Sequence, residues 1–530
     1  MTAPATTAPA AKMVSLTIEG RQVSVPEGTS ILEAAKYAGI LVPHYCYHPG
    51  LPVAGVCRMC LVEVEKAPKL APSCATSVAE GQVVHVHSEK ALEARKGVLE
   101  LLLINHPLDC PICDQAGECE LQDYTYMEGR ADSRLRDPKR FNPMEDFGGD
   151  VIYVTNRCIL CTRCVRFMDT MAEDPVLNVS ERGDRAVIGK FEGHDLTHPW
   201  AGNVIDLCPV GALLSKDSLN KVRAWEVDRT ASVCPNCTQG CNMIVETRDN
   251  MVVRLRPRSN EAVNRFFMCD YGRLNYRWIN RQDRVETPLV RRGSDLVAAE
   301  WDAALAAAAN ALNGAKARVL ASPMLSNEAL GLLARLIRKT GGSGVYRVAK
   351  GERAPLPGVE NLARREDLGA NVRGLELFGF TRSDTPAWNL GSGDVLVVAG
   401  DEQLAIDASA VGSPRAIIVI GGTLPSWARA AAVVLPIANF AEEEGTFTNV
   451  DGRVQRFMQA RSAPGFSRPS FAALGDLLAL LGEGSGYMLA SDAFAAVAAS
   501  ESPFGGMSYD TLGLRGALIA GAPSAGGAAR

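Results

Sequence analysis

All fifteen cysteines of this 530-residue chain lie at or before position 269, and the rest of the sequence contains none. Their spacing divides them, together with one histidine, into four sets of four that leave no cysteine over. An odd number of cysteines argues against complete pairing in disulfides, and thiols in a reducing cytosol more often bind metals or take part in catalysis. The first half of the chain is therefore predicted to consist of metal-binding modules.

Composition excludes several other classes of protein. The net charge of −5 and the pI near 5.9 give no basic surface of the kind that binds nucleic acid. The longest apolar runs, such as 395–399 and 477–481, are far shorter than the roughly 18 residues that span a bilayer. Residues 1–12 are rich in Thr, Ala and Pro and lack the basic and apolar regions of a signal peptide. We therefore expect a disordered leader there, no export, and contact with a membrane only through partners.

The first 88 residues have the pattern of a small α+β unit. Polar and apolar residues alternate over 14–25 on both sides of Glu19-Gly20-Arg21, which predicts a β-hairpin. An apolar-periodic helix is predicted over 31–38, ended by Gly39, and a cysteine-bearing loop follows it. Another helix is expected from residue 89. Its predicted apolar face consists of Leu92, Val98, Leu99, Leu102 and Leu103.

The pattern changes after about residue 285. Alanine-rich helical runs at 298–312 and 327–337 alternate with short β-runs. This alternation predicts an α/β fold with a parallel sheet. The β-runs are 319–320, 395–398 and 417–420.

The first set has the spacing C-x10-C-x2-C-x13-C. Gly55, just before the C-x2-C pair, lets backbone N–H groups approach and donate to cluster sulfurs. Four thiolates on a loop after a short β-rich unit favour a [2Fe–2S] cluster. A four-cysteine zinc site needs the same ligands, but it usually has two C-x2-C pairs. The predicted ligands are Cys46, Cys57, Cys60 and Cys74.

The second set has the spacing H-x3-C-x2-C-x5-C and follows the helix that begins at residue 89. A lone histidine is more often structural, but His106 stands where a fourth ligand is missing. Neutral imidazole in place of a thiolate makes a cluster less negative and raises its potential. Zinc held by three cysteines and one histidine is the alternative. The predicted [4Fe–4S] ligands are His106, Cys110, Cys113 and Cys119.

The third set contains C-x2-C-x2-C, in which one tight loop offers three thiolates, followed by a distant Cys-Pro pair. This arrangement resembles bacterial ferredoxins, including Val210-Gly211-Ala212 after Cys208-Pro209. Such ferredoxins often carry two clusters, whereas this stretch has ligands for one. The predicted [4Fe–4S] ligands are Cys158, Cys161, Cys164 and Cys208.

The fourth set has the spacing C-x2-C-x3-C-x27-C and resembles the N-terminal cluster site of molybdopterin oxidoreductases such as formate dehydrogenases. In those enzymes the last cysteine begins a Cys-x-Lys-Gly-Arg segment whose lysine lies between cluster and pterin. Here the segment is Cys269-Asp270-Tyr271-Gly272-Arg273, with Tyr271 in place of the lysine. The predicted [4Fe–4S] ligands are Cys234, Cys237, Cys241 and Cys269.

The order of the four sets resembles one family, the large iron–sulfur subunit of bacterial NADH:quinone oxidoreductase, respiratory complex I. The resemblance includes 43–49, a Pro-His-Tyr-Cys-Tyr-His-Pro segment, and covers residues 13 to about 290. It continues more weakly through 444–449 and 452–455, which look like a molybdopterin-fold signature.

The resemblance implies a multidomain α+β and α/β protein. The expected domains are a [2Fe–2S] ferredoxin-like β-grasp domain at 13–88, a histidine/three-cysteine [4Fe–4S] domain at 89–145, a ferredoxin-like [4Fe–4S] domain at 146–226, a molybdopterin-type [4Fe–4S] domain at 227–284 and a truncated molybdopterin-oxidoreductase-like α/β domain at 285–530, expected without cofactor or molybdenum.

The resemblance also implies a function. Electrons from NADH, taken up by FMN on a neighbouring subunit, would pass through this chain toward quinone. The Cys46, Cys158 and His106 clusters would form the main path, and the Cys234 cluster would lie off it. Proton pumping would belong to membrane subunits. The implied partners are the FMN/NADH-binding subunit and the quinone-proximal subunits of the peripheral arm, at the cytoplasmic side of the inner membrane.

Three other classes are considered. A molybdenum or tungsten enzyme related to formate dehydrogenase commonly binds its metal through a C-terminal cysteine or selenocysteine, and an iron-only hydrogenase needs further C-terminal cysteines. No cysteine follows Cys269. The third class is a zinc-bearing scaffold, against which the Cys158 loop argues most directly, because it matches a [4Fe–4S] cluster better than a tetrahedral zinc site.

Other polar residues are given structural roles. His194 and His198 are expected in a loop and not as a metal pair on a helix, because Pro199 follows directly. The acidic run 442–444 is expected to be solvated or to cap a helix. His44 and His48 flank Cys46 and are expected to shape its loop.

Overall fold

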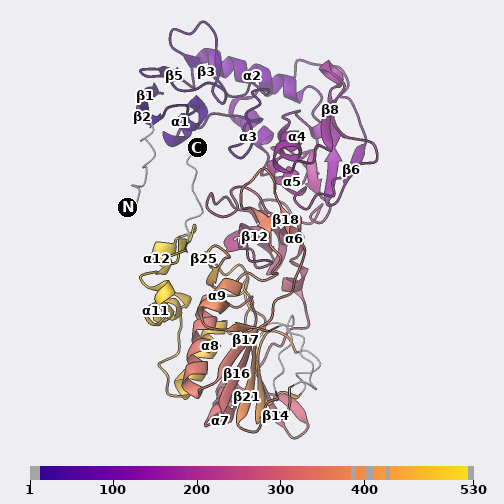
Figure 1. The fold of residues 1–530 in the computed structure, drawn as a ribbon. Coiled ribbons are helices and arrows are strands. Elements are labelled where there is room, and N and C mark those ends of the chain that lie inside the picture. Colours follow the sequence, from indigo (N-terminus) through magenta and orange to yellow (C-terminus); the bar gives the residue numbers. More distant parts are fainter. Residues whose placement is uncertain (1–11, 384–388, 401–410, 425–429, 523–530) are drawn as a thin grey trace. The chain divides into compact units, whose positions relative to one another are not determined.

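A computed structural model describes residues 12–383, 389–400, 411–424 and 430–522. The chain forms two compact units, one up to Glu226 and one from Val227 onward (Figure 1). The leader expected at 1–12 lies, except for its last residue, outside the described residues. Among the helices of the described ranges, none has both the length and the apolar character needed to cross a membrane.

The first unit begins with a five-stranded sheet of strand order β2-β1-β5-β3-β4. The alternating segments form the predicted antiparallel hairpin, and β1 also pairs in parallel with β5. Helix α1 begins after Ser30, whose side chain accepts from the N–H of Glu33, and Gly39 follows it with a φ of +70°. The elements are β1 (Met13–Ile18), β2 (Arg21–Pro26), α1 (Ile31–Tyr37), β3 (Leu61–Val64), β4 (Ala71–Pro72) and β5 (Val83–His85).

Helix α2 (Glu89–Leu103) forms as predicted, but its buried face differs from the predicted one. The fully buried positions are Ala91, Arg95 and Leu99, so Leu99 is the only member of the predicted apolar face among them. The other four members of that face are half-buried, and the charged residue Arg95 is buried because it has hydrogen-bond partners inside the protein. Helix α3 (Glu120–Glu128) supplies one of them, the carboxylate of Glu128.

The rest of the first unit is built from short elements around the third cysteine set. A three-stranded sheet has the order β10-β7-β6, and β8 and β9 form a separate hairpin. The elements are β6 (Met144–Gly148), β7 (Val151–Val154), η1 (Thr155–Arg157), α4 (Arg163–Arg166), the π-helical turn η2 (Phe167–Met171), β8 (Leu177–Ser180), η3 (Gly183–Arg185), β9 (Val187–Lys190), α5 (Asn203–Leu207) and β10 (Leu213–Ser215). His194 and His198 lie in a loop, as predicted.

The second unit starts with an antiparallel three-stranded sheet that carries the fourth cysteine set. Its strands hydrogen-bond in the order β11-β12-β13. The elements are β11 (Asp228–Val233), β12 (Asn242–Arg248), β13 (Met251–Pro257), α6 (Asp270–Leu274) and η4 (Arg277–Asn280).

An eight-stranded sheet forms the centre of the second unit, with the order β15-β14-β23-β22-β21-β16-β17-β20. The six strands from β23 to β20 pair in parallel, which confirms the predicted α/β fold, and β14 and β15 form an antiparallel edge. Helices α7 and α8 pack against this sheet (Figure 1). The elements are β14 (Leu289–Arg292), β15 (Asp295–Ala298), α7 (Trp301–Leu312), β16 (Lys316–Ala321), α8 (Asn327–Thr340), β17 (Ser343–Tyr346), β20 (Thr381–Arg382), β21 (Asp394–Ala399), β22 (Ala416–Ile420) and β23 (Val433–Leu435).

Smaller elements complete the second unit. They are β18 (Ala354–Pro355), β19 (Ala363–Arg364), α9 (Val372–Leu377), β24 (Gly445–Thr448), β25 (Arg453–Phe457), α10 (Ser470–Leu480), α11 (Ala490–Ser500), η7 (Ser502–Phe504), α12 (Tyr509–Leu512) and β26 (Ala517–Leu518). Strands β24, β25 and β26 form a sheet, and β24 and β25 come from the segment similar to the molybdopterin-fold signature.

Two of the three residues of the acidic run 442–444 are buried and not solvated, contrary to one of the two predicted roles, and the side chain of Glu444 is 36% exposed. Glu442 and Glu443 are 2% and 4% exposed. Glu442 accepts two hydrogen bonds from Arg284, and Glu443 accepts from the backbone N–H and hydroxyl of Ser470, the first residue of α10. The capping role is therefore confirmed for Glu443. Sequence alone misses the burial because both sets of partners lie far along the chain.

Candidate functional site: four sets of cluster ligands

The first set brings its four thiols into hydrogen-bonding contact. Hydrogen bonds from Cys57 and Cys74 lower the pKa of the Cys46 thiol far below its usual value, and a hydrogen bond with Cys74 lowers that of Cys60 to about 7. The backbone N–H of Cys46 donates to Sγ of Cys57 at 3.4 Å. Gly55 has a φ of +64°, in the left-handed region that the tight approach of the loop requires. The loop thus offers both sulfur ligands and N–H donors.

The three cysteines of the second set lie in a loop that Arg223 holds in place. Its Nη1 donates to the carbonyl of Cys113 at 2.7 Å and its Nη2 to that of Pro111 at 2.5 Å. Cys110 is exposed, whereas Cys113 and Cys119 are buried. Burial raises the pKa of both buried thiols, to about 11 for Cys119, and the neighbouring cysteines add to the shift.

His106 lies three residues after α2 and is half-buried. Burial lowers the pKa of its imidazole to about 4, and the positive charges of Lys139 and Arg157 add to this shift while Asp109 opposes it. Its Nδ1 is buried and has no hydrogen-bond partner among the described residues. A neutral imidazole with a free nitrogen is the form in which histidine binds a metal, so the residue fits the predicted role.

The third set wraps its loop through two residues with unusual backbone conformation. Leu160 and Thr162 have φ values of 54° and 60°, in a backbone region that residues other than glycine rarely adopt. The N–H of Leu160 donates to Sγ of Cys158 at 3.3 Å. Burial raises the pKa of all four thiols, to about 11 for Cys158 and Cys208 and about 12 for Cys161. Such strained turns are found at functional sites.

The fourth set is the most enclosed, since its four cysteines are 4–5% exposed. The N–H of Cys234 donates to the carbonyl of Cys241 at 2.8 Å, and the N–H of Gly272 donates to Sγ of Cys269 at 3.3 Å. A Cβ at Gly272 would lie 3.2 Å from Sγ of Cys234, so glycine allows the close approach. Burial raises the pKa of all four thiols, to about 12 for Cys234.

Two arginines supply positive charge beside the fourth set. The guanidinium of Arg364 lies 5.6 Å from the ring centroid of Tyr271, within cation–π range. The backbone N–H of Arg365 donates to the Cys237 thiol, and its Nε donates to Gln239 at 2.7 Å. Tyr271, which stands in place of the lysine, therefore has two cations from another segment nearby. The sequence analysis missed these arginines because their distance along the chain from the four cysteines gives no sign that they lie close to them.

Another missed residue is Gly211, which lies three positions after Cys208. A Cβ at this glycine would overlap Sγ of Cys113, a predicted ligand of the second set. The backbone N–H of Glu120 also donates to the carbonyl of Pro209 at 3.0 Å. The second and third sets are thus in direct contact through the loops that carry them. Spacing within each set carries no signal of such a contact.

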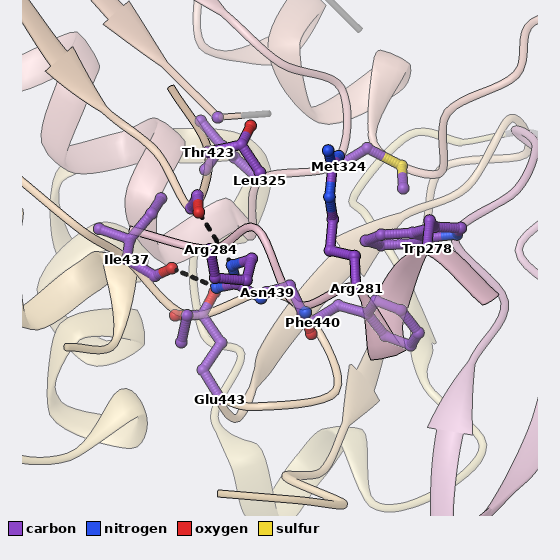
Figure 2. Close-up of a pocket in the computed structure, with 13 residues that line it drawn as sticks. Trp278, Arg281, Arg284, Met324, Leu325, Thr423, Ile437, Asn439, Phe440 and Glu443 are labelled. Atoms are coloured by element: carbon purple, nitrogen blue, oxygen red, sulfur yellow. Dashed lines mark hydrogen bonds between the residues drawn. The ribbon is translucent and has the colours of Figure 1, made fainter. Parts of the chain in front are cut away.

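A small cavity lies at the carboxyl ends of the parallel strands in the second unit, lined in part by Met324 after β16 and Gly400 after β21 (Figure 2). This is where the strand order reverses, the place at which open α/β sheets bind ligands. The cavity measures about 50 Å³ between the described residues. Arg284 on its wall donates to the carbonyls of Gly422 and Ile437 and forms a two-pronged ion pair with Glu442.

All fifteen cysteines carry free thiols. Among the described residues, no group of three or more His, Cys, Asp or Glu side chains is arranged to hold a single metal ion. The donors of the four sets are sulfur and imidazole nitrogen, the ligands of iron–sulfur clusters, and backbone N–H groups point at sulfurs in all four sets. Fold and donor chemistry together define a multidomain protein of the iron–sulfur class.

Comparisons with known families follow the same order along the chain. The matched family models are the 2Fe-2S iron-sulfur cluster binding domain at 11–89, the NADH-ubiquinone oxidoreductase-G iron-sulfur binding region at 95–134, the ferredoxin-like domain of NADH-quinone oxidoreductase subunit 3 at 148–214, the molybdopterin oxidoreductase Fe4S4 domain at 227–281 and molybdopterin oxidoreductase at 356–479. The chain therefore contains domains of families that bind [2Fe–2S] and [4Fe–4S] clusters.

Curated relatives of this chain point to the same family as the matched family models. The chain is 40% identical to an NADH-quinone oxidoreductase subunit of Rickettsia bellii over 332 residues, which are 62% of this chain and 49% of the relative. It is 42% identical to the mitochondrial NADH-ubiquinone oxidoreductase 78 kDa subunit of Candida albicans over 340 residues, which are 63% of this chain and 47% of the relative. The resemblance to the large iron–sulfur subunit of NADH:quinone oxidoreductase is confirmed, and the chain spans about half the length of these relatives.

A solved structure titled "Crystal structure of NAD+-reducing [NiFe]-hydrogenase in the H2-reduced state" is 29% identical with a TM-score of 0.34. The similarity covers 39% of this chain and 90% of that chain.

Proposed function

We propose that this chain is an electron-transfer subunit of a proton-translocating NADH:quinone oxidoreductase. It holds one [2Fe–2S] cluster in the first set and one [4Fe–4S] cluster in each of the other three. The sixteen ligands predicted from the spacing hold them, and the domains have the boundaries expected from the sequence. Electrons from FMN on a partner subunit pass through the first, third and second sets toward quinone, and the fourth set lies beside this route.

The observation that carries the proposal is the matched order of four cluster-ligand sets and four cluster-binding family models. Bound clusters would supply reversible one-electron chemistry. The residues of the chain hold them through thiolates and one imidazole, exclude water by burial, and donate backbone hydrogen bonds to sulfur. These donors and the nearby arginines set how readily each site accepts an electron.

The domain at 285–530 has a structural or docking role without molybdenum in this proposal. Two observations support it. The cavity at the strand ends has room for a few water molecules rather than a dinucleotide pterin, and its Arg284 is already neutralised by Glu442. The partners are the FMN/NADH-binding subunit and the quinone-proximal subunits, and the chain lies peripherally at the cytoplasmic side of the inner membrane.

Metal analysis of the purified full chain tests the cluster assignment. We expect about 14 iron atoms per chain with matching sulfide, no molybdenum, and four distinguishable paramagnetic signals on progressive reduction. Zinc in place of one group of irons would overturn that set, and stoichiometric molybdenum would overturn the role of the C-terminal domain. Identification of the copurifying subunits tests the partners.

The role of His106 has its own test. The His106→Ala variant should lose or alter one [4Fe–4S] signal and retain the other three, because the change removes one ligand of the second set only. Four unchanged signals would show that His106 is not a ligand. His194→Ala is a matched control, since this histidine lies in a loop outside the four sets.

A further inference from the structure

Two arginines lie inside the third cysteine set. Arg163 stands between Cys161 and Cys164, and Arg166 follows two residues after Cys164, so that the arginines are the first and last residues of α4. The side chain of Arg163 is 5% exposed. A guanidinium this deeply buried stays charged, and its N–H groups need acceptors inside the protein.

The acceptors of Arg163 come from the ligand loops of three different sets. Its Nη2 donates to the carbonyl of Tyr47 at 2.7 Å, and its Nη1 donates to the carbonyl of Leu207 at 3.2 Å. Both nitrogens also lie 3.5 Å from oxygens of the Glu120 carboxylate. Each acceptor residue is the direct sequence neighbour of a proposed ligand. These ligands are Cys46 in the first set, Cys208 in the third and Cys119 in the second.

Arg166 provides an internal comparison. It donates to the carbonyls of Cys46 and Pro52 in the first domain and, at 3.3 Å, to that of Cys161. These contacts join the first and third sets only. Of these two arginines, Arg163 is the one whose hydrogen bonds extend to all three ligand loops of the first unit.

One donor of Arg163 remains without a partner. Its Nε is buried and forms no hydrogen bond to the described residues. Its backbone N–H already donates to the Cys161 thiol. A buried unpaired N–H requires an explanation, and the sulfur of a bound cluster is an acceptor that would provide one.

The charge of Arg163 has a direct redox consequence. Reduction adds negative charge to an iron–sulfur cluster, and a nearby buried cation stabilises that charge more strongly than it would in water. The planar guanidinium also fixes its acceptors in one geometry, which the flexible ammonium of lysine cannot reproduce.

We propose that Arg163 is a positioning residue that raises the reduction potential of the third set and holds the ligand loops of the first three sets together. The proposal rests on the proposed function, because it requires that the sets hold clusters. It assigns the residue two separable contributions, a charge and a rigid set of hydrogen bonds.

The test compares Arg163→Gln, Arg163→Lys and Arg166→Gln in the full chain within its purified complex. Each cluster is titrated by paramagnetic resonance at controlled potential, and iron is counted in every sample. In Arg163→Gln we expect the equilibrium constant for reduction of the third cluster by its neighbours to fall about ten-fold. This equals a fall of about 59 mV in its reduction potential for one electron. Arg163→Lys should retain most of the wild-type potential but transfer electrons to the second set more slowly. Arg166→Gln should leave the second-set signal unchanged.

The outcomes distinguish a failure of the proposed role of Arg163 from a failure of the proposed function of the chain. Unchanged potentials in a fully loaded Arg163→Gln variant would overturn the role of the charge. An equal fall of potential in the lysine and glutamine variants would also overturn it, and this comparison holds even if the glutamine variant loads fewer clusters. Wild-type electron transfer in Arg163→Lys would overturn the role of the rigid hydrogen bonds. If the wild-type chain itself lacks cluster signals, the proposed function fails instead.

Discussion

At the scale of single residues, contacts between ligand loops matter as much as the ligands. Gly211 shows this most clearly, because it belongs to the loop of Cys208 in the third set and yet lies against Cys113 of the second. A Cβ there would lie 2.3 Å from Sγ of Cys113, so a side chain cannot be accommodated without moving that sulfur. Glycine at this position is thus explained by a neighbour almost a hundred residues away along the chain.

We predict that Gly211→Ala lowers the iron content of the second set while the third-set signal remains. The added Cβ displaces the Cys113 thiol from the position at which it would bind iron. Iron analysis and paramagnetic resonance of the full chain measure the effect. The control is Gly97→Ala in α2, where a Cβ has no atom within 4 Å and should stabilise the helix by about 0.5–1 kcal/mol. Equal loading of the second set in both variants would contradict the prediction.

At the scale of elements, Arg95 joins α2 to its surroundings. Its Nε lies 2.6 Å from the carboxylate of Glu128 at the end of α3, and its Nη1 donates to the carbonyls of Val86 and Leu61 at 2.9 and 3.2 Å. The arginine is fully buried and the glutamate is 8% exposed at its side chain. One side chain therefore connects α2 with α3 and with the sheet of the first domain.

We expect Arg95→Met to lower the free energy of unfolding of the first unit by about 3–5 kcal/mol, because it leaves the buried carboxylate of Glu128 unpaired. Urea denaturation followed by circular dichroism measures it. Arg134→Met is the control, since its pair with Glu100 involves an arginine side chain that is 74% exposed, and little change is expected. A similar small effect of both substitutions would show that the buried pair does not hold the elements together.

At the scale of the whole molecule, the second unit buries acidic side chains in two different ways. Glu442 has a guanidinium partner, whereas Glu328 accepts hydrogen bonds from Thr446 and, at 2.8 Å, from the hydroxyl of Tyr509. Burial raises the pKa of Glu328 to about 7. It also raises the pKa of Glu443 to about 8. The stability of this unit should therefore depend on pH through its interior.

The sign of this dependence follows from the raised pKa of Glu328. Below its ordinary value of 4.5 the carboxyl is protonated in both folded and unfolded chains. Between pH 4.5 and about 7 only the unfolded chain ionises, so the contribution to stability is lost as the pH rises through this range. The loss is on the order of 3–4 kcal/mol by the conversion of about 1.4 kcal/mol for each pKa unit.

The Glu328→Gln variant should reduce this loss, because the amide resembles the protonated carboxyl and does not ionise. The measurement is the midpoint of thermal unfolding of the second unit at pH 5 and pH 8. The wild-type chain should lose more stability between these two values than the variant. Parallel pH profiles would mean that Glu328 does not titrate in this range.

Local patterns in the sequence were sufficient to predict several helices and strands and to group the cysteines into sets. The alternation over 14–25 predicted the hairpin because strand pairing across a short turn depends on adjacent residues. The alternation of helices and β-runs after residue 285 predicted the parallel sheet for a similar reason. The spacing of the cysteines predicted four sets, and tight loops bring together the members of a set that are a few residues apart, whereas the fold brings the distant Cys208 and Cys269 to theirs.

The tertiary structure alone decided which charged residues are buried and which loops meet. Arg95, Glu442 and Arg163 look like surface residues in the sequence, since burial of a charge depends on partners that folding brings from distant segments. Arg163 meets Tyr47 across 116 positions, and Arg284 meets Glu442 across 158. The sequence by itself therefore determined the class of protein and predicted the ligand sets. Contacts between the sets came only from the fold, because no local spacing encodes a long-range hydrogen bond.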